Sequence, residues 1–130
     1  MTLGQMIAAG CYDWKNEDIN SKNFKIKGTG KVELEAQFIH FGKDMSSKAV
    51  LAELDRMNLR PGRIEELLAV GEKYPEKQLE FPIVELGSVA GVRGDRLVAY
   101  LDRNDRKRNL NLNWFDNDWN ANYRFLAFRK

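Results

Sequence analysis

The sequence predicts one α+β domain in which two helices pack against a mostly antiparallel sheet. Apolar residues recur at helical spacing in two consecutive segments, one over residues 46–58 and one that begins at Ile64 and stops before Pro75, and the segments around them have the pattern of short strands. The connections between the later strands are too short and too polar to hold the crossover helices of a parallel sheet. A length of 130 residues fills one domain, so we expect a single domain over residues 1–130.

The N-terminal part of the chain supplies a short helix and the clearest strand. Thr2 is placed to cap a helix that runs to Ala9, and the residues from there to Gly30 are expected to be mainly arm and loop. From Lys31 to Phe38 polar and apolar residues alternate strictly, which is typical of a half-buried strand.

Two helices follow this strand. Ser46 or Ser47 can accept the free amide hydrogens at the start of the first helix, which runs to Asn58. Two glutamates in the first turn of the second helix interact favourably with its dipole, and Pro75 requires it to end before that residue. Beyond Pro75 the pattern predicts four short strands, at residues 81–86, 96–101, 109–115 and 123–129.

Composition and charge exclude several classes of protein. The net charge of +2, from 21 basic and 19 acidic residues, gives no overall field that would attract nucleic acid. Cys11 is the single cysteine, which excludes a disulfide scaffold and fits a reducing compartment. The chain has no apolar run of membrane-spanning length and begins without the basic region of a signal peptide. We therefore expect a soluble, cytoplasmic protein without membrane insertion.

Asparagine and aromatic residues concentrate in the last third of the chain, which makes this tract the candidate binding surface. Asparagine alternates with leucine and tryptophan in residues 109–114, so a strand there places asparagines on one face and apolar side chains on the other. Asparagine is a poor strand former, which points to a role other than stability, and its amide suits ligand contact. The candidate ligand-binding residues are Asn104, Asn109, Asn111, Asn113, Asn117, Asn120 and Asn122.

Two other interpretations of this tract stay open. Asn-rich stretches also occur as solvated loops, with the aromatic residues serving as core anchors. Alternatively, the basic segment 103–108 is a site for phosphate or single-stranded nucleic acid. Its cationic residues are Arg103, Arg106, Lys107 and Arg108, and such a charge run is also typical of a solvated hairpin tip.

Local motifs assign no catalytic group, metal or cofactor. Residues 116–120 match the opening of an EF-hand loop, but Ala121 and Ala127 stand where that loop has its glycine and its bidentate glutamate. Nothing local marks Cys11 or His40, the single cysteine and the single histidine, as activated. The expectation is therefore a non-enzymatic protein that needs neither a cofactor nor a metal.

Three segments resemble a group of short uncharacterised bacterial proteins of candidate-phyla type. The first two segments read RPGRIEELLA at 60–69 and FPIVELGS at 81–88. The third spans residues 114–130 and ends RFLAFRK. The order of elements is also similar to that of the C-type lectin fold, in which a strand and two helices precede a run of antiparallel strands. This similarity implies that the N-terminal and C-terminal strands pair with each other.

The Asn-rich tract further resembles the variable region of target proteins of diversity-generating retroelements, in which the fold displays altered side chains to ligands. The resemblance implies that the seven asparagines face a ligand, and that the scaffold consists of Leu110, Leu112, Trp114, Phe115, Trp119 and Phe125. Ala121 follows Trp119-Asn120, so the calcium motif of true lectins is missing. We expect a ligand-binding or display module whose partner is a protein or a surface ligand, with nucleic-acid binding through segment 103–108 as the alternative.

Overall fold

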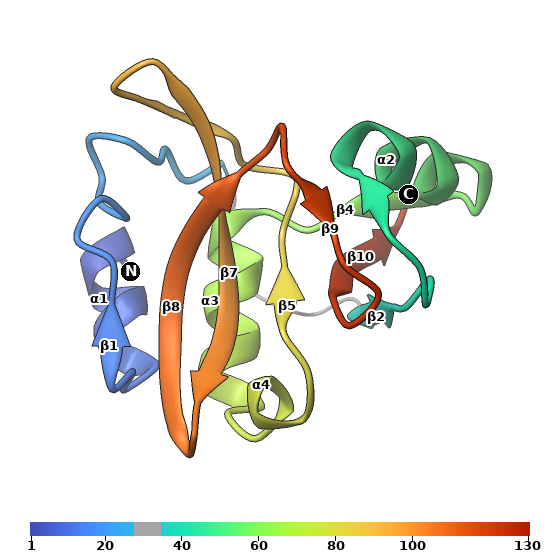
Figure 1. Ribbon diagram of the computed structural model, residues 1–130. Helices are drawn as coiled ribbons and strands as arrows, with labels where there is room; N and C mark the ends of the chain where they lie inside the picture. Colours follow the sequence, from blue (N-terminus) through green and yellow to red (C-terminus); the bar gives the residue numbers. More distant parts are fainter. Residues whose placement is uncertain (28–34) are drawn as a thin grey trace.

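The computed structural model describes residues 1–27 and 35–130, in which helices pack against a mixed β-sheet (Figure 1). The helices are α1 (Leu3–Ala9), α2 (Ser47–Arg56), α3 (Ile64–Lys73) and α4 (Lys77–Glu80). The strands are β1 (Trp14–Lys15), β2 (Gln37–Ile39), β3 (Met45–Ser46), β4 (Leu59–Pro61), β5 (Ile83–Val84), β6 (Ala90–Val92), β7 (Asp95–Asn104), β8 (Lys107–Trp114), β9 (Asp118–Trp119) and β10 (Arg124–Arg129).

The predicted helices are confirmed, and local hydrogen bonds explain where they begin. The side chain of Thr2 accepts the backbone N–H of Gln5 at 3.1 Å at the start of α1. Ser46 is the residue that caps α2, because its Oγ accepts the N–H of Ala49 at 3.1 Å. The first N–H of α3, that of Ile64, is instead satisfied by a residue distant in sequence, Ser88.

The predicted strands are present with altered lengths. The strand expected over Lys31–Phe38 lies partly outside the described residues, and β2 covers only its end together with Ile39. The strand expected over 81–86 shortens to the two residues of β5. The two strands expected after it lengthen into the β7–β8 hairpin, which is the longest feature of the sheet (Figure 1).

The two ends of the fold meet in one sheet. Strand β10 pairs antiparallel with β2 and with β4, and parallel with β5. Strand β1 from the N-terminal arm, which the sequence did not predict, pairs parallel with β8. The other strand pairings in the described part are antiparallel, so the sheet is mixed but mainly antiparallel, as expected.

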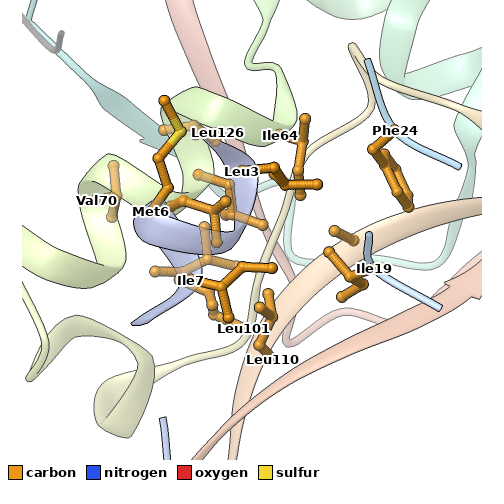
Figure 2. Packing of buried hydrophobic residues seen from close by; sticks show 14 of the residues in the cluster. Leu3, Met6, Ile7, Ile19, Phe24, Ile64, Val70, Leu101, Leu110 and Leu126 are labelled. Carbon is orange, nitrogen blue, oxygen red and sulfur yellow. The ribbon is translucent and has the colours of Figure 1, made fainter. Parts of the chain in front are cut away.

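Apolar side chains pack on both faces of the sheet because side chains alternate along each strand. On one face, α1 and α3 cover Leu101, Leu110 and Leu126 (Figure 2). On the other face, α2 and the β3–β9 ribbon cover Val98 and Phe125. The sheet is therefore a central layer with an apolar cluster on each face. Alternate residues along β7 and β8 face opposite clusters.

A buried carboxylate links the start of α3 to the middle of the sheet. The side chain of Glu85 is fully buried and accepts the backbone N–H groups of Ser88 at 2.7 Å and Ala99 at 3.1 Å. Ser88 in turn accepts the N–H of Ile64 at 2.9 Å. Burial raises the pKa of Glu85 well above its ordinary value, and these backbone donors oppose part of the rise.

Candidate ligand-binding surface

Three of the predicted asparagines lie in a row on one face of β8. The antiparallel register sets each of them opposite a residue of β7, in the pairs Asn109–Asp102, Asn111–Tyr100 and Asn113–Val98. Residues that are directly opposite in an antiparallel pair point to the same face, so amides, a tyrosine and a carboxylate line up together. All three asparagines are half-buried.

The segment after β9 brings a second tyrosine and two further asparagines to this face. The ring of Tyr123 lies 6.0 Å from that of Tyr100 and 4.9 Å from that of Trp119. Asn120 and Asn122 precede this tyrosine along the chain and are exposed. We give the name amide–tyrosine face to the following set of residues: Tyr100, Asp102, Asn109, Asn111, Asn113, Asn120, Asn122 and Tyr123.

Trp119 anchors this segment beneath the surface. Its side chain is only 1% exposed, and its Nε1 donates a hydrogen bond to Oγ of Ser47 at 2.7 Å. The same hydroxyl donates to the carbonyl of Phe115 at 2.6 Å, so the β8–β9 turn and the start of α2 share one polar contact inside the apolar cluster. The expected scaffold role of Trp119 fits this position.

A groove of about 430 Å³ lies at the edge of the amide–tyrosine face. The residues that line it include His40, Asp102, Arg103, Asn120, Asn122, Tyr123 and Arg124. It joins the end of β7 to the segment between β9 and β10, so residues about twenty positions apart in sequence share one hollow. Sequence reasoning pointed to three of these residues: Asn120 and Asn122 as ligand-binding asparagines, and Arg103 as part of the basic segment.

The ionisable groups of this face affect one another's pKa values. Burial raises the pKa of Tyr100 to about 12, and the Asp102 carboxylate and Tyr123 add to the rise. Burial also raises the pKa of Tyr123, where hydrogen bonding to Asn113 opposes the rise and Asp102 adds to it. The pKa of Asp102 is itself raised by burial, and hydrogen bonding to Asn109 opposes this rise.

The two remaining asparagines lie apart from the face. Asn104 ends β7 at the exposed tip of the hairpin. Asn117 lies in the turn between β8 and β9, where it lines a separate hollow together with Trp114 and Arg96. The structure therefore brings five of the seven predicted residues together and leaves two elsewhere.

Two of the asparagines also stabilise the strand that carries them, which corrects the expectation that they have no structural role. Oδ1 of Asn111 accepts the backbone N–H of Leu112 at 2.7 Å, and Oδ1 of Asn113 accepts that of Trp114 at 2.8 Å. Asn16 donates a further hydrogen bond to Asn111 at 3.1 Å. These amides satisfy N–H groups on the edge of β8 beyond the end of β1, where such groups otherwise invite pairing with another strand.

Trp114 does not take the buried scaffold position that was expected of it. Its side chain is 56% exposed, whereas Leu110 on the same face of β8 is fully buried. The difference arises because Trp114 ends the strand, beyond the reach of α1 and α3, while Leu110 lies in the centre of the cluster beneath them. The alternation of residues along β8 predicted which face Trp114 lies on, but it did not predict how much of the side chain is buried.

The basic segment 103–108 is divided between surface and interior. The side chains of Arg103, Arg106 and Lys107 are exposed. Arg108 is half-buried, and its guanidinium donates to Oε1 of Gln78 at 3.1 Å and to the carbonyl of Gly71 at 2.7 Å. It also donates to the carbonyl of Gly10 and lies 4.8 Å from the centre of the Tyr12 ring. Arg108 is therefore occupied in holding α1, α3 and the hairpin together.

No protein family, curated protein or solved structure matches this chain. Among residues 1–27 and 35–130, no group of three or more histidine, cysteine, aspartate or glutamate side chains is arranged to hold a metal ion. No helix in the described part has the length and apolar character needed to cross a bilayer.

Sequence reasoning missed Tyr100, Asp102, Tyr123 and His40. The alternation along β7 places Tyr100 and Asp102 on one face, and that signal was present in the sequence. The sequence pattern did not reveal the register that sets these residues opposite Asn111 and Asn109, because that register depends on the length of the hairpin turn. The approach of His40, whose Nε2 lies 2.7 Å from the carbonyl of Ala121, is a long-range contact without a local signal.

Proposed function

We propose that this protein is a non-enzymatic binding module that holds its ligand on the amide–tyrosine face, and that the ligand is a protein or a surface-bound molecule. The single observation that carries the proposal is the gathering of five asparagines around two tyrosines beside a groove of about 430 Å³. Tyrosines offer large contact area with little loss of conformational freedom, and amides donate and accept hydrogen bonds.

The proposal has two finer parts: that the fold is C-type-lectin-like, and that the protein is a variable protein of a diversity-generating retroelement. Two features support the first. Elements β2, α2, α3 and the later strands follow one another in the order of that fold, and β2 pairs antiparallel with β10. The second is supported by the exposure of Asn122, whose side chain can change without disturbing the core.

Position-specific photo-cross-linking in an extract of the source cells tests the binding function. A photoreactive amino acid replaces Asn122 in one variant and Asn109 in another, and the matched control places it at Lys22, an exposed position in the loop after β1. We expect one adduct of the same mass from both face positions and none from the control. Adducts that are equally abundant at all three positions, or absent from both face positions, contradict the proposal.

The genomic neighbourhood tests the idea of diversification separately. We expect a reverse transcriptase gene close by, together with a near-copy of the segment that encodes residues 104–122 and differs from it at adenines. A neighbourhood without these features removes the diversification idea and leaves the binding proposal to the cross-linking result.

A further inference from the structure

Asp102 is a carboxylate at the groove whose charge is poorly compensated. Its side chain is half-buried, and its Oδ1 is fully buried without a hydrogen-bond partner in the described part of the chain. Burial of a carboxylate is unfavourable unless a donor or a positive charge compensates for it. The raised pKa of Asp102 is the consequence of this burial.

The cationic side chains of the groove are engaged with other groups. Arg103 donates to the carbonyl of Asp105 at 3.0 Å. Arg124 lies 4.6 Å from the centre of the Phe81 ring and donates to the carbonyl of Asn122 at 3.3 Å. A guanidinium in contact with the carboxylate would lower its pKa, yet Asn109 is the group that opposes the rise.

The surroundings of Asp102 suit a positive charge in a second way. Asp102 lies on the same face of β7 as Tyr100 and lines the groove together with Tyr123, and its carboxylate adds to the rise in pKa of both tyrosines. The ring of Tyr123 lies 6.0 Å from that of Tyr100. Aromatic rings attract cations through their electron-rich faces, and a carboxylate next to them strengthens that attraction.

We propose that the groove beside Asp102 receives a positively charged group of the ligand, an alkylammonium or guanidinium, with Asp102 as its counter-ion and Tyr123 and Asn122 at its rim. This inference rests on the binding function proposed above. The charge comes either from a lysine or arginine side chain of a partner protein or from a free polyamine.

Titrations of the whole protein followed by ¹⁵N–¹H NMR test the inference. The probe is Nα-acetyl-lysine methylamide, which mimics a lysine within a polypeptide. Its neutral counterpart, Nα-acetyl-norleucine methylamide, is the control ligand, and putrescine represents a free polyamine. We expect saturable shifts of the amides of Asn109, Asn122 and Tyr123 with the lysine probe or with putrescine, and at least tenfold weaker binding of the norleucine probe. Whichever of the lysine probe and putrescine binds more tightly identifies the source of the charge.

Variants separate the role of the carboxylate from a general effect of charge. Asp102→Asn retains the shape of the side chain and should weaken cation binding at least tenfold. Asp105→Asn removes the same charge at the hairpin tip and should leave binding unchanged; an Asn122→Ala variant should weaken it through the rim alone. Equal binding of the neutral probe, equal losses in the two aspartate variants, or no shift with any probe would overturn the inference. Cross-linking from Asn122 and Asn109 would then still decide the binding function by itself.

Discussion

Oδ1 of Asn113 accepts the backbone N–H of Trp114 at 2.8 Å, and Asn111 makes the same contact with Leu112. Both N–H groups lie on the edge of β8 beyond its pairing with β1. At each of these two positions the asparagine side chain occupies an N–H group that could otherwise pair with a further strand.

The double variant Asn111→Thr, Asn113→Thr should associate with itself. Threonine favours strands and lacks the amide oxygen that occupies the edge N–H groups. We expect the sedimentation coefficient to rise with protein concentration in the double variant but not in the parent. Asn109→Thr makes the same exchange at a position without such a contact and serves as the control. Identical sedimentation of all three proteins would show that these contacts do not protect the edge.

Arg108→Ala should destabilise the protein by about 2–4 kcal/mol, because several charge-assisted hydrogen bonds to half-buried groups disappear together. Urea unfolding measures the change. Arg108→Lys should lose similar stability, because the single ammonium group of lysine cannot donate to several separate acceptors as the planar guanidinium does. Arg106→Ala, at the exposed tip, should stay within about 0.5 kcal/mol of the parent. Equal effects at positions 106 and 108 would contradict the role assigned to Arg108.

Glu85 should make stability fall as the pH rises. Its pKa in the folded protein lies above that of the unfolded chain, so the folded state binds the proton more tightly. The resulting stabilisation is complete below the unfolded pKa and disappears as the pH rises through the folded pKa.

Glu85→Gln tests this linkage. The variant should be less stable by about 1–3 kcal/mol at neutral pH, because an amide has one acceptor oxygen for the N–H groups of Ser88 and Ala99. The stability difference between parent and variant, measured by urea unfolding from pH 4 to pH 8, should shrink with rising pH. A difference that stays constant or grows over that range would contradict the raised pKa.

Truncation to alanine should reduce stability far more at Trp119 than at Trp114. Trp119→Ala removes a buried ring and its bond to Ser47, and should cost about 3–5 kcal/mol. Trp114→Ala removes an exposed ring and should change stability by less than about 0.5 kcal/mol. Thermal unfolding of the two variants makes the comparison. A large loss at position 114 would show that its ring supports the sheet after all.

The parts of the fold that the sequence predicted correctly are those fixed by local chemistry. Helices α2 and α3 follow from apolar spacing, and the start of α2 follows from Ser46. The hairpin strands follow from alternation. Strand β1 had no such signal, because its two exposed residues form a strand only where β8 offers a free edge.

Only the part of the candidate site that depends on local sequence pattern could be predicted. Alternation along β8 placed its asparagines on one face, but it could not tell that Asn111 and Asn113 also bond to the neighbouring backbone. The basic residues before them looked equivalent in sequence. Only the long-range contacts of Arg108 with α3 and with the N-terminal arm separate it from Arg106.

Strand β10 lies between segments that begin at residues 37, 59 and 83, and it pairs with each of them. During synthesis on a ribosome, those segments emerge long before residues 124–129 do. The edges that these segments present to β10 must remain solvated or weakly paired until residues 124–129 leave the exit tunnel, because a strand cannot pair before its partner has emerged. The sheet can therefore close only after residues 124–129 have left the exit tunnel, whereas helices α2 and α3 can form earlier from local interactions.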